Sequence, residues 1–202
     1  TTPIAPRPTR CSKRNLPKSS SGTLADRLRT GPMSADDVLG LGVALADALH
    51  VLHGHGVLHR DIKPSNIGFD RTGLPKLLDF GLARLLEHDA PAANSTSAAG
   101  TPLYMSPETL ASAPPTTEVD LWAMHVSLYE AISGRHPFRG DTMDDTTWNI
   151  RHTPAPPLTL ATLDGTRAAR ITAYFQTALS ERPFDRPKDA AAAASALRSL
   201  MT

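Results

Sequence analysis

The chain has 202 residues, 40% of them hydrophobic, and its 21 basic and 20 acidic side chains leave a formal charge of +1. This length suits one good-sized hydrophobic core, and the near-zero charge excludes a globally basic nucleic-acid binder. A single cysteine, Cys11, excludes an internal disulfide framework and favours a reducing compartment, so we expect a cytoplasmic protein without a membrane segment.

The chain begins with a segment, residues 1–21, that is rich in Pro, Ser, Thr, Lys and Arg and contains no acidic residue. Such a segment buries too little apolar surface to offset the entropy of ordering, which predicts a disordered tether. A basic docking arm is the alternative. Because the first residue is Thr1 rather than methionine and no secretory signal is visible, we expect a fragment or a processed product.

Helical periodicity begins after this segment. A short helix is predicted over 23–29. Ser34 is predicted to cap a longer helix, with Asp37 as the second half of a capping box, and Gly54 ends its apolar face.

Short apolar runs of strand length follow the long helix, at 57–58, 67–69 and 76–78. The last two are predicted to pair as a hairpin around the turn at 70–73. Residues 83–106 have no clear period and many small polar side chains, which is typical of a long functional loop.

The second half of the chain is predicted to be helical at both ends. Thr117 is expected to cap an apolar helix that runs to Gly134, residues 135–166 are expected to be irregular, and two helices close the chain at 167–180 and 189–201. The last helix is rich in alanine but has no basic face, so packing against the protein is expected rather than membrane binding. The predicted fold class is α+β, mainly helical, with a small β-hairpin.

The residues that carry chemistry fall in four motifs: HRDIKPSN at 59–66, DFG at 79–81, GTP at 100–102 and SPE at 106–108. The first motif lies between the long helix and the hairpin, where rigid neighbours hold its polar groups. The order and spacing of the four motifs resemble the eukaryotic-type serine/threonine protein kinase family, and their texture is most similar to its bacterial members. The resemblance covers residues 22–202 and implies a protein-kinase-like C-lobe.

The resemblance also implies a role for each site residue. Asp61 would accept the proton of the substrate hydroxyl, and Lys63 would contact the phosphate that passes from ATP to a serine or threonine of a protein. A lysine two residues after the aspartate is the serine/threonine pattern rather than the tyrosine pattern. Asn66 and Asp79 would hold Mg²⁺, which keeps several waters and needs few protein ligands. ATP and Mg²⁺ are therefore the implied cofactors.

Supporting residues are implied in the same way. His59 and Phe80, the latter followed by Gly81, match an internal stack of the family whose base is Asp120, and Trp122 matches a packing residue of the same helix. Asp120 would accept hydrogen bonds from the backbone of the catalytic segment. The resemblance also implies a buried ion pair at the end of the activation segment, between Glu108 and Arg186.

Residues 82–100 resemble an activation loop. The candidates for regulatory phosphorylation in and beside it are Ser95, Thr96, Ser97 and Thr101. The resemblance implies that Arg60 pairs with such a phosphate, which adds about one to three charge-assisted hydrogen bonds. The alternative is that residues 94–99 are only a flexible polar linker.

Four histidines, His50, His53, His55 and His59, are close in sequence and raise the question of a metal site. A structural zinc site needs about four ligands that converge tetrahedrally. These histidines straddle a helix end and His59 already has a role, so no metal site is expected among them.

Two positions depart from the family pattern. The family places a large apolar residue under the adenine at the position of Gly68, so adenine packing is expected to be weaker unless a neighbour such as Phe69 compensates. A glycine common in the family is replaced by His125, which puts the local packing of its helix in doubt.

No glycine-rich loop, β3 lysine or αC glutamate is recognisable in these 202 residues. Lys13 and Lys18 lie too close to the first helix to replace that lysine. We therefore expect residues 1–21 to be non-native or disordered, residues 22–202 to be a partial kinase domain, and the isolated chain to have little or no turnover.

The alternative function is a non-catalytic binding or scaffold module, against which the intact magnesium ligands argue. Protein substrates are the expected partners, and no nucleic acid is expected. Dimerisation through a longer parent and membrane tethering of that parent stay open.

Overall fold

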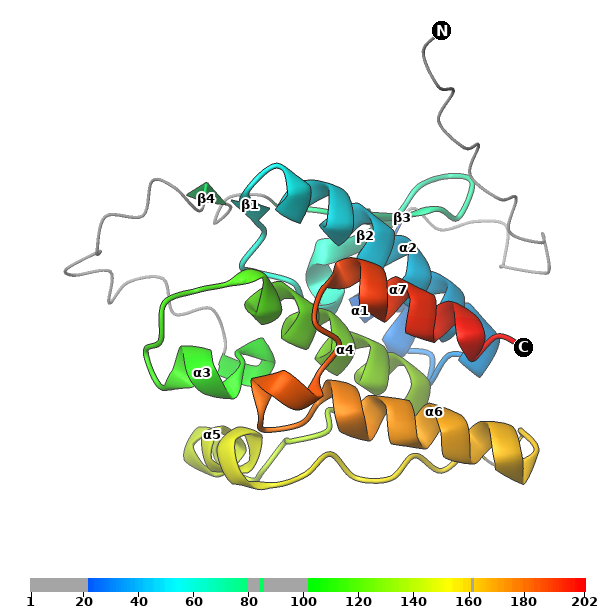
Figure 1. Cartoon of the computed structure of the whole chain (residues 1–202). Coiled ribbons are helices and arrows are strands. Elements are labelled where there is room, and N and C mark those ends of the chain that lie inside the picture. The colour runs from blue at the N-terminus through cyan, green and yellow to red at the C-terminus, as the bar shows by residue number, and fades with distance from the viewer. Residues whose placement is uncertain (1–21, 80–83, 86–101, 161) are drawn as a thin grey trace, which may run out of the picture.

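A computed structural model describes residues 22–79, 84–85, 102–160 and 162–202, and Figure 1 shows that helices dominate this part of the chain. Its helices are α1 (Leu24–Leu28), α2 (Ala35–Gly54), α3 (Pro107–Leu110), α4 (Thr117–Ser133), α5 (Met143–His152), α6 (Gly165–Ala178) and α7 (Ala190–Ser199). Short 3-10 helices are η1 (Pro64–Asn66), η4 (Pro102–Tyr104) and η5 (Pro183–Asp185). The predicted fold class, mainly helical α+β, is confirmed.

Polar side chains begin each of these α-helices by accepting a hydrogen bond from a backbone N–H of the first turn. These capping residues are Thr23, Ser34, Ser106, Thr116, Thr142, Asp164 and Asp189. Each such cap stabilises its helix by about 1 kcal/mol. The capping box predicted at Ser34 is half formed. The Asp37 carboxylate accepts from the Ser34 hydroxyl at 2.7 Å rather than from the Ser34 backbone N–H.

Helix α5 lies in a region that the sequence predicted to be irregular, and that prediction is wrong. A complete capping box begins the helix, with the Thr142 hydroxyl accepting from Asp145 N–H at 3.0 Å and the Asp145 carboxylate accepting from Thr142 N–H at 3.0 Å. The helix buries only Thr146 and Ile150, so its sequence shows no apolar period.

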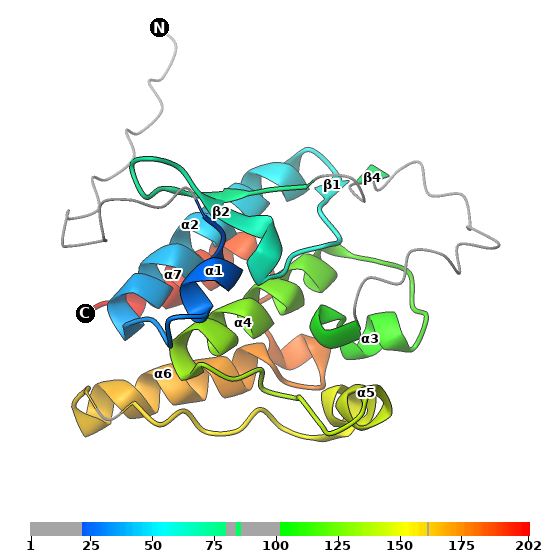
Figure 2. The same ribbon diagram turned by 180° about the vertical axis from the view of Figure 1, so that it is seen from behind.

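The core lies where α2 packs against both α4 and α7 (Figures 1 and 2). At Gly42 a Cβ would lie 2.8 Å from Leu128 Cδ1 and 3.0 Å from Leu197 Cδ1, so glycine permits this close approach. Ala193 and Ala194 are buried in α7, which confirms that the alanine-rich helix packs against the protein. None of the described helices has the length and hydropathy needed to cross a bilayer.

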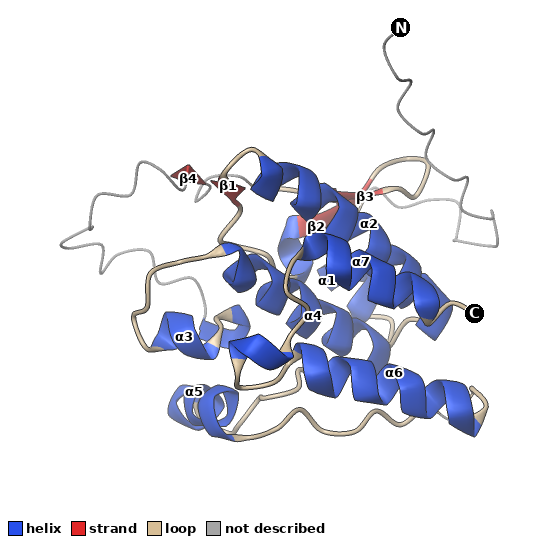
Figure 3. Ribbon diagram, in the orientation of Figure 1, coloured by secondary structure: helices blue, strands red, loops and turns tan. Residues whose placement is uncertain are grey.

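The strands of the described chain form two separate pairs, which lie in the upper part of the fold in Figure 3. Strand β2 (Ile67–Phe69) pairs antiparallel with β3 (Pro75–Leu77), which confirms the predicted hairpin. Strand β1 (Val57–Leu58) pairs with β4 (Arg84–Leu85), although the sequence analysis placed the latter inside one long loop. The pairing joins residues far apart in sequence, and two-residue strands carry no period of their own.

His125 is fully buried in α4 and is hydrogen-bonded at both ring nitrogens. Its Nδ1 lies 2.7 Å from the Leu121 carbonyl and its Nε2 lies 2.7 Å from the Tyr174 hydroxyl. Because a carbonyl only accepts, Nδ1 carries the proton and Tyr174 donates to Nε2. The departure from glycine at this position therefore joins α4 to α6 through a satisfied polar contact.

A long-range ion pair joins α3 to the segment before α7. The Arg186 guanidinium donates to both carboxylate oxygens of Glu108, at 2.8 and 3.1 Å, and to the carbonyls of Ser180 and Glu181. It also lies 4.5 Å from the centre of the Trp122 ring. The Arg186 side chain is 5% exposed, so its charge depends on these partners.

Acid is expected to destabilise the fold through His125. Burial lowers the pKa of His125 from 6.5 to about 4, so its contribution to the free energy of unfolding is complete above pH 6.5 and is lost as the pH falls through 4. The loss amounts to about 3 kcal/mol. Urea unfolding at several pH values measures it. His125→Gln should flatten the pH dependence of the free energy of unfolding, whereas His50→Gln, the control at an exposed site, should leave it unchanged. The same pH dependence in both variants would contradict the assignment to His125.

Glu108→Gln is expected to lower the free energy of unfolding by about 3 kcal/mol, because it leaves the buried Arg186 charge without a counterion. Urea denaturation of the whole chain measures this change. The exposed Glu181→Gln is the control and should change the value by less than about 0.5 kcal/mol. A loss in Glu108→Gln as small as the control's would mean that the pair behaves as a surface ion pair.

Candidate active site

The buried carboxylate of Asp120, in the first turn of α4, fixes the backbone before the candidate catalytic segment. Asp120 Oδ2 accepts from His59 N–H at 2.9 Å and Oδ1 accepts from Arg60 N–H at 2.8 Å. The residue is only 1% exposed, and the N-terminal end of a helix favours a negative charge there. These are the hydrogen bonds that the sequence analysis expected from Asp120.

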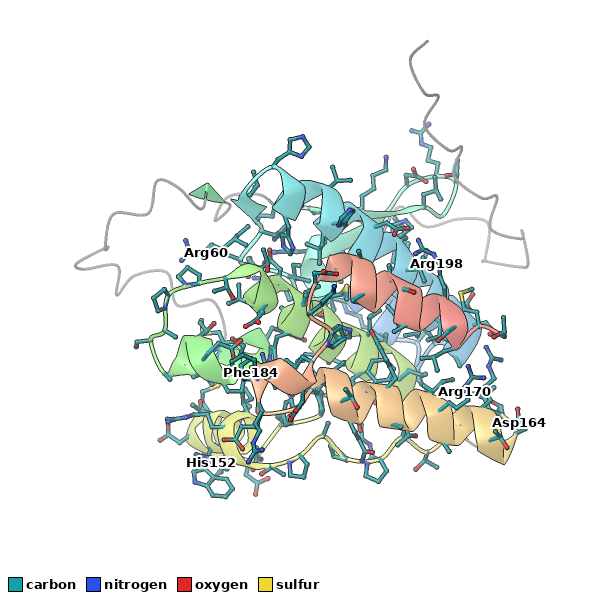
Figure 4. The ribbon with its side chains drawn as sticks, viewed as in Figure 1. Arg60, His152, Asp164, Arg170, Phe184 and Arg198 are labelled. Carbon is teal, nitrogen blue, oxygen red and sulfur yellow. The ribbon has the colours of Figure 1, made fainter. Side chains whose placement is uncertain are left out.

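Two backbone conformations at the site are left-handed. Arg60 has φ 67° and Asp79 has φ 59°, values that cost a non-glycine residue about 1–3 kcal/mol. The hydrogen bond from Arg60 N–H to Asp120 holds the first of them. Figure 4 places the Arg60 side chain at the surface, beside the start of α4. The left-handed turn at Arg60 separates two sets of contacts. His59, before it, bonds the Leu78 carbonyl, and Asp61, after it, contacts Lys63 and Asn66.

Asp61, Lys63 and Asn66 form one hydrogen-bonded cluster. Lys63 Nζ donates to both carboxylate oxygens of Asp61, at 2.8 Å each, and the Asn66 amide NH₂ donates to Asp61 Oδ2 at 2.8 Å and to the Asp61 carbonyl at 2.9 Å. The Asp61 side chain is 18% exposed and that of Lys63 is 29% exposed. The carboxylate is thus rigidly oriented and still reachable from solvent.

The amide oxygen of Asn66 is left for another ligand. The carbonyl and the carboxylate of Asp61 only accept hydrogen bonds, so the NH₂ group of Asn66 must point toward Asp61. The amide oxygen, Oδ1, then points away from Asp61. Among the described residues, no donor is hydrogen-bonded to Asn66 Oδ1. Asp79 adds a carboxylate, so the two residues offer the hard oxygen donors that Mg²⁺ prefers.

The backbone of Leu78 joins Asp79 to the cluster. Leu78 N–H donates to the Asn66 carbonyl at 2.8 Å, and the Leu78 carbonyl accepts from His59 Nε2 at 3.1 Å. His59 therefore carries its proton on Nε2, which leaves Nδ1 to accept from Asp61 N–H at 3.4 Å. His59 is 0% exposed and connects the two motifs.

The space above Gly68 is filled by Leu78. A Cβ at Gly68 would lie 2.7 Å from Leu78 Cδ1. Phe69 is one residue along the strand, so its side chain projects to the opposite face, where the Arg27 guanidinium lies 3.3 Å from its ring centre. The neighbour that replaces the missing side chain is thus Leu78 rather than Phe69.

Several predicted residues lie outside the described part of the chain. They are Phe80, Gly81, Ser95, Thr96, Ser97 and Thr101. The roles expected for them, in the internal stack and in regulation by phosphorylation, stay predictions.

His53 is a site residue that no sequence motif indicates. His53 Nε2 lies 3.0 Å from Asp120 Oδ2, so a third partner holds this carboxylate. The other histidines of the group have separate partners, since His55 Nδ1 bonds the Val51 carbonyl and His59 bonds Leu78. The signal in the sequence was only that His53 lies within a turn of the end of the long helix.

Comparison with known proteins agrees with this geometry. The family model described as "Protein kinase domain" matches residues 16–189. A probable serine/threonine-protein kinase, CE0033 of Corynebacterium efficiens, is 35% identical over 173 residues, which cover 84% of this chain and 26% of the relative. The DNA damage-responsive serine/threonine-protein kinase RqkA of Deinococcus radiodurans is 36% identical over 148 residues, or 73% of this chain and 22% of the relative.

Serine/threonine-protein kinase PknK of Mycobacterium tuberculosis is 34% identical over 175 residues, which cover 85% of this chain and 15% of the relative. The chain thus spans about a quarter or less of the length of these curated relatives. Because the family model matches most of the sequence, and because the matched range contains the cluster around Asp61, the chain belongs to the protein kinase family.

Proposed function

We propose that the chain forms the catalytic lobe of a serine/threonine protein kinase, which transfers the γ-phosphate of ATP to a serine or threonine hydroxyl of a protein. The observation that carries this proposal is the cluster in which Lys63 and Asn66 both donate to the Asp61 carboxylate at 2.8 Å. The relatives' names, all serine/threonine-protein kinases, support the choice of acceptor.

In the proposed reaction Asp61 orients the substrate hydroxyl and accepts its proton as the oxygen attacks the γ-phosphorus. The bond from that phosphorus to the bridging oxygen of ATP breaks, and ADP leaves. Phosphoryl transfer asks an enzyme mainly for positioning and charge neutralisation. The three hydrogen bonds that the Asp61 carboxylate accepts from Lys63 and Asn66 provide the positioning.

Lys63 is proposed to neutralise charge on the transferred phosphate. Its ammonium group lies on Asp61 and is part-exposed, so a small rotation of the side chain carries it to a phosphate oxygen next to the same carboxylate. Asn66 Oδ1 and the Asp79 carboxylate are proposed to hold Mg²⁺, which would supply positive charge between the phosphates.

Proposed magnesium binding is testable with Mn²⁺·ADP, because paramagnetic broadening detects weak complexes. Titration into ¹⁵N-labelled chain should broaden the backbone amide signals around Asn66 and Asp79 first. Asp79→Asn should raise the required Mn²⁺·ADP concentration about tenfold or more, because a charged ligand is lost. The exposed Asp141→Asn is the matched control and should leave the titration unchanged. Broadening centred elsewhere, or equal titrations for both variants, would refute the assignment of these ligands.

The isolated chain is expected to transfer phosphate slowly, because its 202 residues contain no recognisable glycine-rich loop to cover the nucleotide. Incubation with γ-labelled ATP and mixed serine, threonine and tyrosine peptides measures the rate. Any label should appear on serine or threonine and should be lost in Asp61→Asn, while Asp144→Asn serves as the control. Label on tyrosine, or transfer that survives Asp61→Asn, contradicts the proposal. Absence of both transfer and Mn²⁺·ADP binding favours a non-catalytic binding module.

A further inference from the structure

A groove opens at the C-terminal end of α4. It has a volume of about 420 Å³, within the range of ligand-binding sites, although it is open to solvent. Its lining residues are Glu130, Gly134, Arg135, His136 and Arg139. Apart from Gly134, all the lining residues have polar side chains, so the groove can hold a charged ligand.

Two exposed guanidinium groups dominate the charge of this groove. Arg135 and Arg139 are both exposed, and none of the ion pairs among the described residues involves either of them. The carboxylate in the groove, Glu130, is already engaged, because its Oε2 accepts from the Tyr104 hydroxyl at 2.6 Å. Tyr104 is half-buried, so this contact draws the Glu130 charge inward and leaves the arginines facing solvent.

His136 holds the segment that lines the groove through two hydrogen bonds. His136 Nε2 donates to the Leu103 carbonyl at 2.8 Å, and its Nδ1 accepts from Phe138 N–H at 3.2 Å. Burial lowers the pKa of His136, so the ring is neutral near pH 7. These bonds fix the segment after α4 against η4, and they place the two arginines on a rigid support.

The α4 carbonyl end lies in the same place and partly opposes the arginines. A helix C-terminus carries about half a negative charge, and its effect fades within one turn. The two arginine side chains are long and each carries a full positive charge. An anion at the mouth of the groove is therefore attracted by the guanidinium groups more strongly than it is repelled by the helix end.

The groove and the anchor of the candidate active site lie at opposite ends of α4, because Asp120 is in its first turn and Gly134 is its C-cap. Along α4, Glu130 is ten residues from Asp120, the anchor of the catalytic segment, which corresponds to about 15 Å. An extended peptide covers that distance in about four or five residues.

We infer that this groove recognises acidic side chains of the protein substrate, about four or five residues from the phosphorylated hydroxyl, through Arg135 and Arg139. The inference rests on the proposed kinase function and names its substrate class. Its direct rival is recognition of a basic side chain by Glu130.

Fluorescence anisotropy of labelled peptides with the whole chain tests the inference. Each peptide carries one serine and a block of three glutamates four to six positions before or after it, and matched peptides carry glutamine or lysine in the block. The glutamate peptide of one orientation should bind about fivefold more tightly than its glutamine counterpart, as expected for two exposed ion pairs, and salt should weaken it. The double variant Arg135→Glu/Arg139→Glu should abolish this preference.

Arg71→Glu, in the exposed turn between β2 and β3, is the control for a charge reversal away from the groove and should keep the preference. Arg139→Gln, a milder change, should reduce it if the double variant does not fold. Tighter binding of lysine peptides, equal binding of all peptides, no binding, or a preference that survives the double variant overturns the inference. The assay contains neither nucleotide nor metal, so failure here with intact Mn²⁺·ADP binding refutes only the substrate preference, and the converse refutes only the kinase proposal.

Discussion

Asp120 is a buried carboxylate, and its three hydrogen-bonding partners in the described part of the chain lie 60 to 67 residues away in sequence. A charge in the core is costly unless donors surround it, so the fold must bring α4, the end of α2 and the catalytic segment together at one point. The left-handed backbone of Arg60 is held there by the same carboxylate. The position of Asp61 is thus set by an interaction that lies behind it and that no substrate touches.

The rest of the site is arranged in successive contacts from that anchor. His59 Nε2 donates to the Leu78 carbonyl, and Leu78 N–H donates to the Asn66 carbonyl. The two motifs that are implied to bind phosphate and metal therefore share one hydrogen-bonded frame, built mainly from backbone groups. Side chains that face the solvent, such as Lys63, are then free to change partner without disturbing the frame.

Local patterns predicted much of this structure, and tertiary pairings account for what they missed. The caps and apolar faces of α2 and α4 are readable because each is a property of neighbouring residues. Helix α5 was missed because it buries only two residues, and β4 because its only signal is its partner. At the site, the motif around Asp61 is contiguous and was found. His53 was missed because its partner Asp120 is 67 residues away.

The close approach of Leu78 to Gly68 has a consequence for substitutions at either position. Gly68 and Leu78 share one volume, since a Cβ on the first would lie 2.7 Å from a methyl of the second. A side chain at position 68 therefore requires the end of the Leu78 side chain, which is 40% exposed, to move aside. The two positions are coupled across the hairpin, so the energetic effect of a substitution at one of them depends on the residue at the other.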